Sequence, residues 1–250
     1  PISLGAAGER LRAIIDTWGP QAVAFYASGQ LLTEDYYAAN KLMKGFIGAA
    51  NIDTNSRLCM SSAVVGYKRA FGEDVVPCNY EDVENSDLVV LVGSNAAWTH
   101  PVLYQRLVQA RQARPEMKVV VIDPRRTATC DIADLHLALA PGSDAGLFVG
   151  LLDVIQGTDA WPVSRVAAFC GLTPQEIATF YDWFMTAPRV ITLYTMGINQ
   201  SSSGSDKCSA IINVHLASGK FNRPGCGPFS LTGQPNAMGG REVGGLANQL

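Results

Sequence analysis

The chain has 250 residues, of which 48% are hydrophobic and 16% charged, a composition typical of a globular protein with one large or two modest domains. Its formal net charge of −3 argues against nucleic acid as a partner. No apolar run reaches the roughly 18 residues that a membrane span needs, so we expect no membrane association. The six cysteines are widely spaced and form no Cys-x-x-Cys pair, which disfavours a zinc or complete iron–sulfur site and makes the reducing cytoplasm the default location.

The predicted elements alternate between helix and strand. A helix is expected at about Leu4 to Trp18, and a buried strand at 22–26 leads through Ser28-Gly29-Gln30 to a helix from Thr33 to about Phe46. Four further apolar runs predict strands, each followed by a polar or glycine-containing loop. These strands are 88–92, 119–122, a weaker one at 135–140, and 190–194, with helices expected at 101–114 and 145–155.

Apolar runs without alternation, separated by helices, predict a parallel sheet that is covered on both faces. In such sheets ligands bind outside the carboxyl ends of the strands. Five polar loops at one edge therefore suggest a large, elongated, polyanionic ligand, although each loop by itself is also consistent with a simple tight turn. The dinucleotide pattern Gly-x-Gly-x-x-Gly and the Walker pattern are both missing after these strands, which excludes the standard NAD and ATP cradles.

The last 27 residues contain seven glycines, a composition that suits a backbone approaching a ligand closely; a flexible linker is the alternative interpretation. The chain starts at Pro1 without Met or a signal-peptide pattern, and a helix that Glu242 seems to start has no stop signal before Leu250. We therefore expect the chain to be a piece of a longer protein.

Cys59 lies where a helix is expected to start, with Arg57 two residues earlier. A thiol in that position has a depressed pKa and exists largely as thiolate, the form that attacks electrophiles or binds metals. The alternative is an inert buried thiol.

Several segments resemble a known family, in the order in which they occur. They are SGQLLTEDYYAANKL, DTNSRLCMSSAVVGY, VGSNAAWTHPV, VIDPRRTATC, APGSDAGL, MGINQSSSGSDKCSAIINVHLASGK and GPFSLTGQPNAMGGREVGGLANQL. Together they resemble the central region of bacterial assimilatory nitrate reductases, which belong to the molybdopterin oxidoreductase family and carry molybdenum bis-molybdopterin guanine dinucleotide. Within that family, the stretch 155–161 is shorter than its counterpart.

The resemblance implies an α/β fold like that of the central domains of formate dehydrogenase and DMSO reductase. From the order of the elements we expect a Rossmann-like cofactor-binding domain at 21–200, and part of a second, discontinuous α/β domain formed by 1–20 with 201–250. From the resemblance we also expect the N-terminal iron–sulfur domain and the C-terminal domain of the family to lie outside this chain.

The resemblance also implies roles for particular residues. Cys59 corresponds to the cysteine that ligates molybdenum, and Met60 is typical of nitrate reductases, whereas similar formate dehydrogenases have His there. Arg241 corresponds to an arginine near the metal that binds the oxyanion substrate; a solvated surface arginine is the alternative. The expected cofactor contacts are Gln30, Asn55, Met196, Gly197 and Gln200 on the pterin side, Gly93, Ser94 and Asn95 at the pyrophosphate, and Asp123, Pro124, Arg125, Gly142, Ser143 and Asp144 at the guanosine.

The implied activity is the reduction of nitrate to nitrite in the cytoplasm. Electrons are expected to arrive through a 4Fe-4S cluster, bound outside this chain, from a partner subunit or flavin protein. The alternatives are a periplasmic nitrate reductase, a formate dehydrogenase, or a piece that is inactive because it holds no cofactor.

Overall fold

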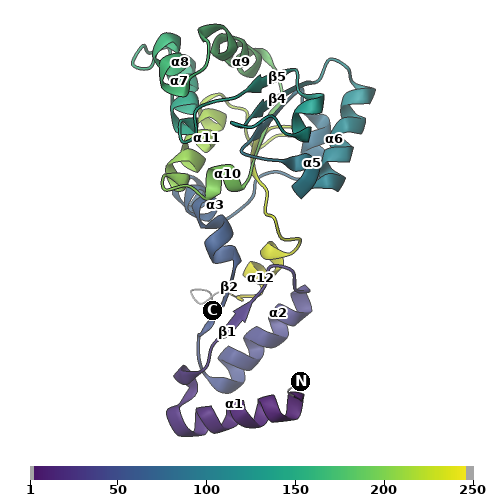
Figure 1. The fold of residues 1–250 in the computed structure, drawn as a ribbon, viewed down its shortest axis with the longest axis vertical. Helices are drawn as coiled ribbons and strands as arrows, with labels where there is room; N and C mark the ends of the chain where they lie inside the picture. The colour runs from purple at the N-terminus through teal and green to yellow at the C-terminus, as the bar shows by residue number, and fades with distance from the viewer. Residues whose placement is uncertain (1–2, 246–250) are drawn as a thin grey trace. The chain divides into compact units, whose positions relative to one another are not determined.

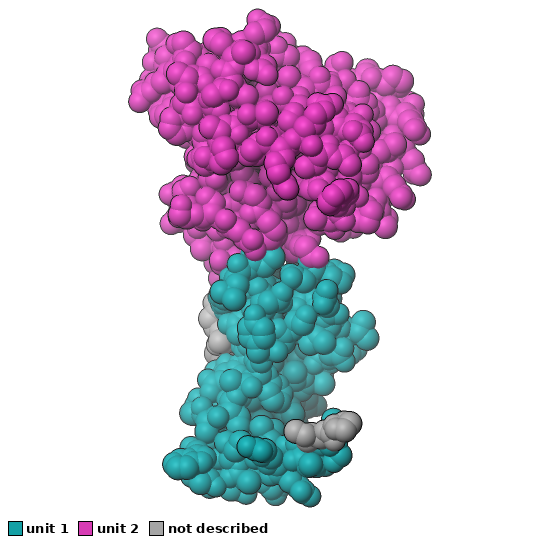
Figure 2. All heavy atoms as spheres, in the orientation of Figure 1, with its two compact units in different colours: residues 1–59, 234–250 teal, residues 60–233 magenta. Residues whose placement is uncertain are grey.

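The computed structural model describes residues 3–245, which fold into two compact units (Figures 1 and 2). The larger unit is continuous and spans 60–233, whereas the smaller one combines 1–59 with 234–250. The sequence predicted two units, one of them discontinuous, but with boundaries at 21–200 and at 1–20 with 201–250. The two structural units therefore have boundaries that differ from those of the predicted domains.

A parallel five-stranded sheet in the order β5-β4-β3-β6-β7 forms the centre of the larger unit. Every residue of β3 and of β6 is buried, which explains why these segments read as continuous apolar runs. The expected mixed α/β fold with a parallel sheet is confirmed. The strands are β3 (Leu88–Val92), β4 (Lys118–Ile122), β5 (Leu135–Leu137), β6 (Val190–Tyr194) and β7 (Gly227–Ser230).

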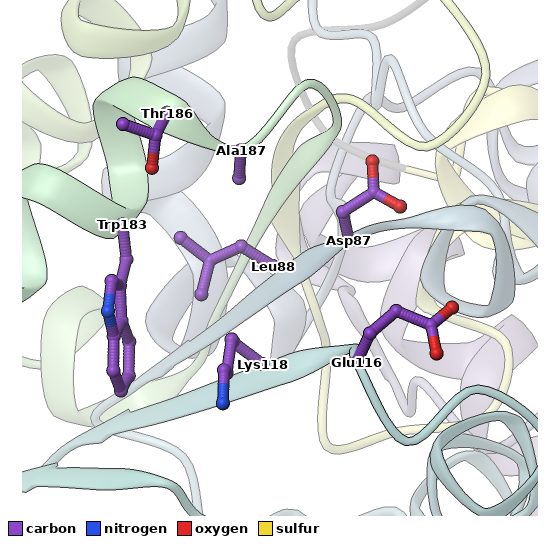
Figure 3. Close-up of a pocket in the computed structure, with 7 residues that line it drawn as sticks. All are labelled: Asp87, Leu88, Glu116, Lys118, Trp183, Thr186 and Ala187. Atoms are coloured by element: carbon purple, nitrogen blue, oxygen red, sulfur yellow. The ribbon is translucent and has the colours of Figure 1, made fainter.

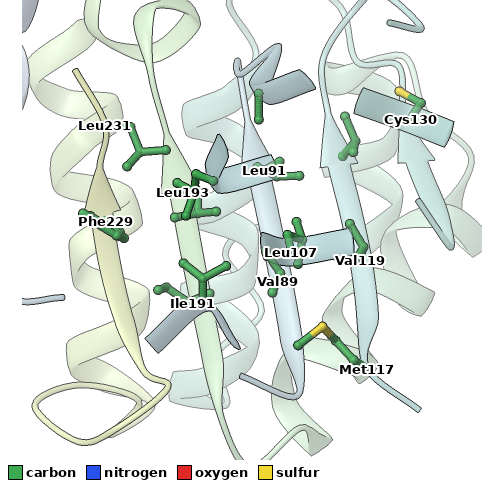
Figure 4. Close-up of a cluster of buried hydrophobic side chains, with 14 residues drawn as sticks. Val89, Leu91, Leu107, Met117, Val119, Cys130, Ile191, Leu193, Phe229 and Leu231 are labelled. Carbon is green, nitrogen blue, oxygen red and sulfur yellow. The ribbon is translucent and has the colours of Figure 1, made fainter. Parts of the chain in front are cut away.

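Helices cover both faces of this sheet (Figure 1). On one face, alternate side chains such as Val89, Leu91 and Leu193 pack against α4 and α6 in the cluster drawn in Figure 4. On the other face, His215 of α11 contacts Thr192 of β6, and α7 packs against α11. The helical segments are α3 (Ser56–Phe71), in which the boundary between the units falls, α4 (Tyr80–Asn85), α5 (Ala96–Thr99), α6 (Pro101–Ala113), η3 (Ala128–Ile132), α7 (Asp144–Gln156), α8 (Val163–Cys170), α9 (Pro174–Thr186), α10 (Met196–Asn199) and α11 (Gly204–Ala217).

The smaller unit is built around a two-stranded parallel sheet, in which Phe25 of β1 pairs with Ile52 of β2. Its core contains Met43 and Ile52, and Leu11 and Ile14 of α1 pack against that core. The first helix ends where the sequence predicted. The elements are α1 (Leu4–Trp18), η1 (Pro20–Ala22), β1 (Phe25–Ala27), α2 (Thr33–Asn40), the π-helix η2 (Lys41–Ile47), β2 (Ile52–Thr54) and α12 (Ala237–Glu242).

Three expectations about these elements require correction. The apolar run at 22–26 does not join the large sheet, because β1 pairs with β2 instead. Residues 201–233 lie with the sheet rather than outside it, because β7 pairs with β6 and α11 covers one face. The helix expected to start at Glu242 differs as well, since α12 ends at that residue, and 246–250 lie outside the described residues.

No helix in the described part of the chain combines the length and the apolar composition that crossing a membrane requires.

Candidate functional site

The carboxyl edge of the large sheet gathers most of the residues for which the sequence predicted a cofactor role. Residues 93–95 follow β3, 123–125 follow β4, 142–144 lie shortly after β5, and 196–200 follow β6. Because all five strands are parallel, these four loops leave the sheet at one edge. The structure therefore brings four of the five predicted loops together on one unit, whereas the loop with Gln30 follows β1 of the smaller sheet.

The strand order reverses direction between β3 and β6, which makes this point the switch in the sheet where α/β proteins hold their ligands. Here the backbones of Gly93 and Gly197 touch. A Cβ on Gly93, whose φ is +53°, would lie 2.7 Å from the Gly197 Cα. The Gly197 N–H donates to the Gly93 carbonyl at 3.1 Å, and the Thr195 hydroxyl donates to the same oxygen at 2.6 Å. Glycine is therefore needed at both positions, because a side chain at either one would clash with the backbone of the other.

In the loops after β3 and β4, two buried hydroxyls lack a hydrogen-bond partner among the described residues. One is the Ser94 Oγ, whose residue is 1% exposed, and the other is the Thr127 Oγ1 in the loop after β4. A buried hydroxyl without a partner is unfavourable unless another molecule supplies one. Both atoms are therefore suited to a polar ligand at the carboxyl edge.

The neighbouring loops are held by their own hydrogen bonds. Thr129 donates its hydroxyl to the Asn95 Oδ1 at 3.0 Å, which ties the loop after β3 to the one after β4. The Asp123 Oδ1 accepts from the Arg125 N–H at 2.8 Å, while the Arg125 side chain is 76% exposed.

Asp144 is buried and forms an ion pair with Lys207 at 2.5 Å. The sequence did not single out Lys207; its only signal was a charge immediately before the apolar run of α11.

In the smaller unit, Asn55 organises the start of α3. Its backbone carbonyl accepts from the Cys59 N–H at 3.1 Å, and its Oδ1 accepts from the Gly29 N–H at 2.9 Å, which fixes the loop that carries Gln30. Cys59 is half-buried in the first turn of the helix, as predicted. Arg57 forms an ion pair with Asp53 at 3.1 Å, so the charge that we expected to act on the thiol is shared with a carboxylate.

Arg241 lies on α12, in the glycine-rich segment that folds back onto α2 and η2. The Asn40 Nδ2 donates to the Val243 carbonyl at 2.9 Å, and the Lys44 Nζ donates to the Gly244 carbonyl at 2.7 Å. A Cβ at Gly240 would lie 2.9 Å from the Tyr36 ring, so glycine is needed there for packing. The segment is therefore ordered by specific contacts, which a flexible linker would not require.

Met60 and three of the other cysteines are largely removed from solvent. Met60, the residue after Cys59, is 3% exposed. Burial raises the pKa of the Cys208 thiol to about 12, and it also raises the pKa values of Cys78 and Cys170. These three cysteines therefore remain protonated thiols, which neither attack electrophiles nor bind metals readily.

A pocket of about 270 Å³ lies at the opposite, amino end of the sheet (Figure 3). Its wall includes Trp183 and Lys118, whose Nζ is 5.5 Å from the Trp183 ring centroid. Asp87, also in the wall, accepts from Arg189 at 2.6 Å, and this hydrogen bonding holds the pKa of Asp87 below its usual value. None of the residues predicted for the cofactor lines this pocket.

The chain belongs to the molybdopterin oxidoreductase family, whose model matches residues 4–250. It is 76% identical over 267 aligned positions to a nitrate reductase of Klebsiella oxytoca, covering 100% of this chain and 31% of that protein. It is 51% identical to a nitrate reductase of Shewanella frigidimarina, covering 93% of this chain and 27% of that protein. It is also 37% identical to the periplasmic nitrate reductase of Desulfovibrio desulfuricans, covering 99% of this chain and 37% of that protein. The chain thus spans about a third of the length of these curated relatives.

Among solved structures, acetylene hydratase from Pelobacter acetylenicus matches with a TM-score of 0.65 and 21% sequence identity, covering 86% of this chain and 32% of that one. At this identity the match concerns the fold alone. Membership of the family implies a molybdenum-containing pterin cofactor.

Proposed function

We propose that this chain is the central, cofactor-binding part of a nitrate reductase that reduces nitrate to nitrite at a molybdenum centre. The observation that carries the proposal is the 76% identity over the whole chain to a protein named nitrate reductase. Because the chain spans 31% of that relative, the activity is proposed for the longer protein rather than for these residues alone.

The carboxyl edge suits an anionic dinucleotide form of the cofactor, namely bis-molybdopterin guanine dinucleotide. The glycine contact at the switch point brings two backbones close together, and the Ser94 hydroxyl has no partner among the described residues. In this proposal, residues 93–95 hold the pyrophosphate, while 123–125 and 142–144 hold guanosine. Gln30, Asn55, Met196, Gly197 and Gln200 contact the pterins.

When bound, the molybdenum–pterin group would supply the two-electron redox chemistry that the reduction of nitrate requires. Overall, nitrate, two electrons and two protons give nitrite and water. Cys59 would hold the metal through its thiolate, a soft ligand that suits molybdenum. Arg241 binds the anion with its permanently charged planar guanidinium group, which matches two oxygens of nitrate at once. Met60, which follows Cys59 in α3 and is buried, belongs with Cys59 and Arg241 to the proposed catalytic site.

The electrons come, in this proposal, through a 4Fe-4S cluster in the longer protein, bound outside this chain, from a partner subunit or a flavin protein in the cytoplasm. A second candidate is a periplasmic enzyme with the same chemistry. It is favoured by the 37% identity to the periplasmic nitrate reductase of Desulfovibrio desulfuricans.

The test uses the full-length protein, purified from a host that makes the cofactor. We expect molybdenum in the protein, nitrite production from nitrate with a reduced viologen, and no formate oxidation. Formate oxidation without nitrite production would contradict the proposal, and fractionation of the native cells would separate the cytoplasmic from the periplasmic candidate.

A further inference from the structure

Lys207, in the first turn of α11, is a buried charged residue of the larger unit. Its side chain is 3% exposed, and its Nζ lies 2.5 Å from the Oδ2 of Asp144, whose side chain is 10% exposed. Lysine is almost never fully buried unless it is paired, because removing an ammonium group from water is unfavourable. The pair joins the first residue of α7 to α11, across 63 residues of sequence.

The position of Lys207 is fixed by the packing of α11. At Gly204, three residues earlier, a Cβ would lie 2.6 Å from the Asn199 carbonyl oxygen, so the start of the helix is held tightly against the preceding turn. The α7 and α11 helices also pack along each other. The Lys207 ammonium group is therefore presented to Asp144 from a rigid element.

The loop at 140–144 is held by a few hydrogen bonds and is open on one side. The Ser143 hydroxyl donates to the Ala140 carbonyl at 2.7 Å, and the Ala140 N–H donates to the Cys170 carbonyl at 2.8 Å. At Gly142, with φ of +91°, nothing lies within 4 Å of the place of a Cβ, so this side of the loop is open. The ion pair ties the end of this open loop to α11.

We propose that Lys207 is a positioning residue, which through Asp144 holds the loop at 140–144 in the conformation that receives the nucleotide end of the cofactor. The proposal rests on the proposed function, since it takes Asp144 to be a nucleotide contact. Lys207 occupies the Oδ2 and leaves the Oδ1 for the ligand. Without the ammonium group, a buried carboxylate would be uncompensated and would either take up a proton or turn away.

A second buried lysine provides a matched control. Lys220 is 7% exposed, and its Nζ donates to the Ala187 carbonyl at 2.6 Å, just before β6 begins. It therefore lies toward the amino end of the sheet, away from the four loops. Replacing Lys220 by Met removes a buried lysine and its hydrogen bonds without touching the loop at 140–144.

The experiment compares full-length wild type with Lys207→Met and Lys220→Met. It measures the melting temperature, and it measures the guanine nucleotide released by acid and the molybdenum, both per folded chain. We expect both variants to melt at lower temperature, but only Lys207→Met to hold about tenfold less nucleotide, the effect of losing one charge-assisted contact. Nucleotide content within twofold of wild type, or an equal loss in both variants, would overturn the proposal.

If Lys207→Met does not fold, the double variant Lys207→Met/Asp144→Asn removes both charges and restores electrical balance. We expect this variant to fold and still to retain little nucleotide, because the carboxylate is missing. Wild-type nucleotide content in the double variant would refute the positioning role. A wild-type protein without any guanine nucleotide or molybdenum would instead refute the proposed function, so the two failures are distinguishable.

Discussion

At the scale of single residues, Cys59 has the narrowest proposed role. We expect Cys59→Ala in the full-length enzyme to abolish most nitrate reduction while leaving the pterin content largely intact, because many loops rather than one thiolate hold the cofactor. Nitrite production and pterin fluorescence after oxidation measure the two properties. Cys78, which is also half-buried, provides the control, since Cys78→Ala should retain activity. If Cys59→Ala reduced nitrate as fast as wild type, Cys59 would not be the metal ligand.

Arg241 provides the second prediction at this scale. Replacing it with Lys keeps a positive charge but loses the planar fork, so we expect kcat/KM for nitrate to fall by about tenfold or more. Steady-state kinetics at several nitrate concentrations measure this effect. The neighbouring substitution Glu242→Gln is the control, with near-normal kcat/KM expected. If Arg241→Lys and Glu242→Gln behave alike, Arg241 does not bind the anion.

At the scale of elements, the junction of β3 and β6 can be tested through its glycine. Gly93→Ala introduces both a strained φ and a clash with Gly197, whereas Gly157→Ala at the end of α7 has a φ of +67° and open space. We expect Gly157→Ala to reduce stability by about 1 kcal/mol through strain alone, and Gly93→Ala to reduce it by about 3 kcal/mol or to prevent folding. Thermal unfolding measures the difference. Equal losses of stability in the two variants would mean that the loops carrying Gly93 and Gly197 can move apart without cost.

The contact between α11 and β6 predicts a dependence on pH. Burial lowers the pKa of His215 to about 4, against an ordinary value of 6.5, and its ring contacts the Lys220 carbonyl and the Thr192 hydroxyl. The folded state therefore protonates His215 less readily than the unfolded state does. The stability contributed by the neutral ring is lost as the pH falls from about 6.5 towards about 4.

Between about pH 7 and about pH 5, this single group should remove about 2 kcal/mol of unfolding free energy. His215→Gln lacks the titrating ring, so its stability should depend less on pH by that amount. Urea unfolding at the two pH values measures the difference. The same slope in both proteins would show that His215 does not carry the effect.

The elements that sequence predicted best are those with long apolar patterns. α1, β3 and β6 agree with the prediction to the residue because periodicity and burial both mark them. β7 was missed because the segment Gly-Pro-Phe-Ser has low strand propensity, and a proline is tolerated there since β7 lies at the edge of the sheet. The strand at 22–26 was assigned to the wrong sheet because an apolar run does not reveal its pairing partner, here the short Ile-Asp-Thr strand.

In the candidate site too, the sequence predicted local features but not contacts between distant segments. The polar loops were recognised because each follows an apolar strand, so one rule about parallel sheets places them together. The Lys207–Asp144 pair and the packing of Tyr36 against Gly240 join segments distant in sequence, and no local pattern announces them. The roles of Cys59 and Arg241 came from resemblance and remain predictions.

At the scale of the whole molecule, the final prediction concerns the 250 residues on their own. The chain spans 31% of its relative from Klebsiella oxytoca. We expect the two long anionic arms of the proposed cofactor to need loops from more than this part. The present loops would still have to be ordered on binding, while part of the contacts that offset that ordering is missing.

We therefore expect the isolated chain to contain no molybdenum and to produce no nitrite from nitrate with a reduced viologen, even though Cys59 and Arg241 are both present. Metal analysis and the nitrite assay measure this, with the full-length protein from the same host as control. Without the ligand, the loops near Gly93, Ser201 and Gly239 should exchange their amide hydrogens faster than in the full-length protein. Molybdenum at about one atom per chain would instead mean that these residues hold the cofactor without contacts from the rest of the protein.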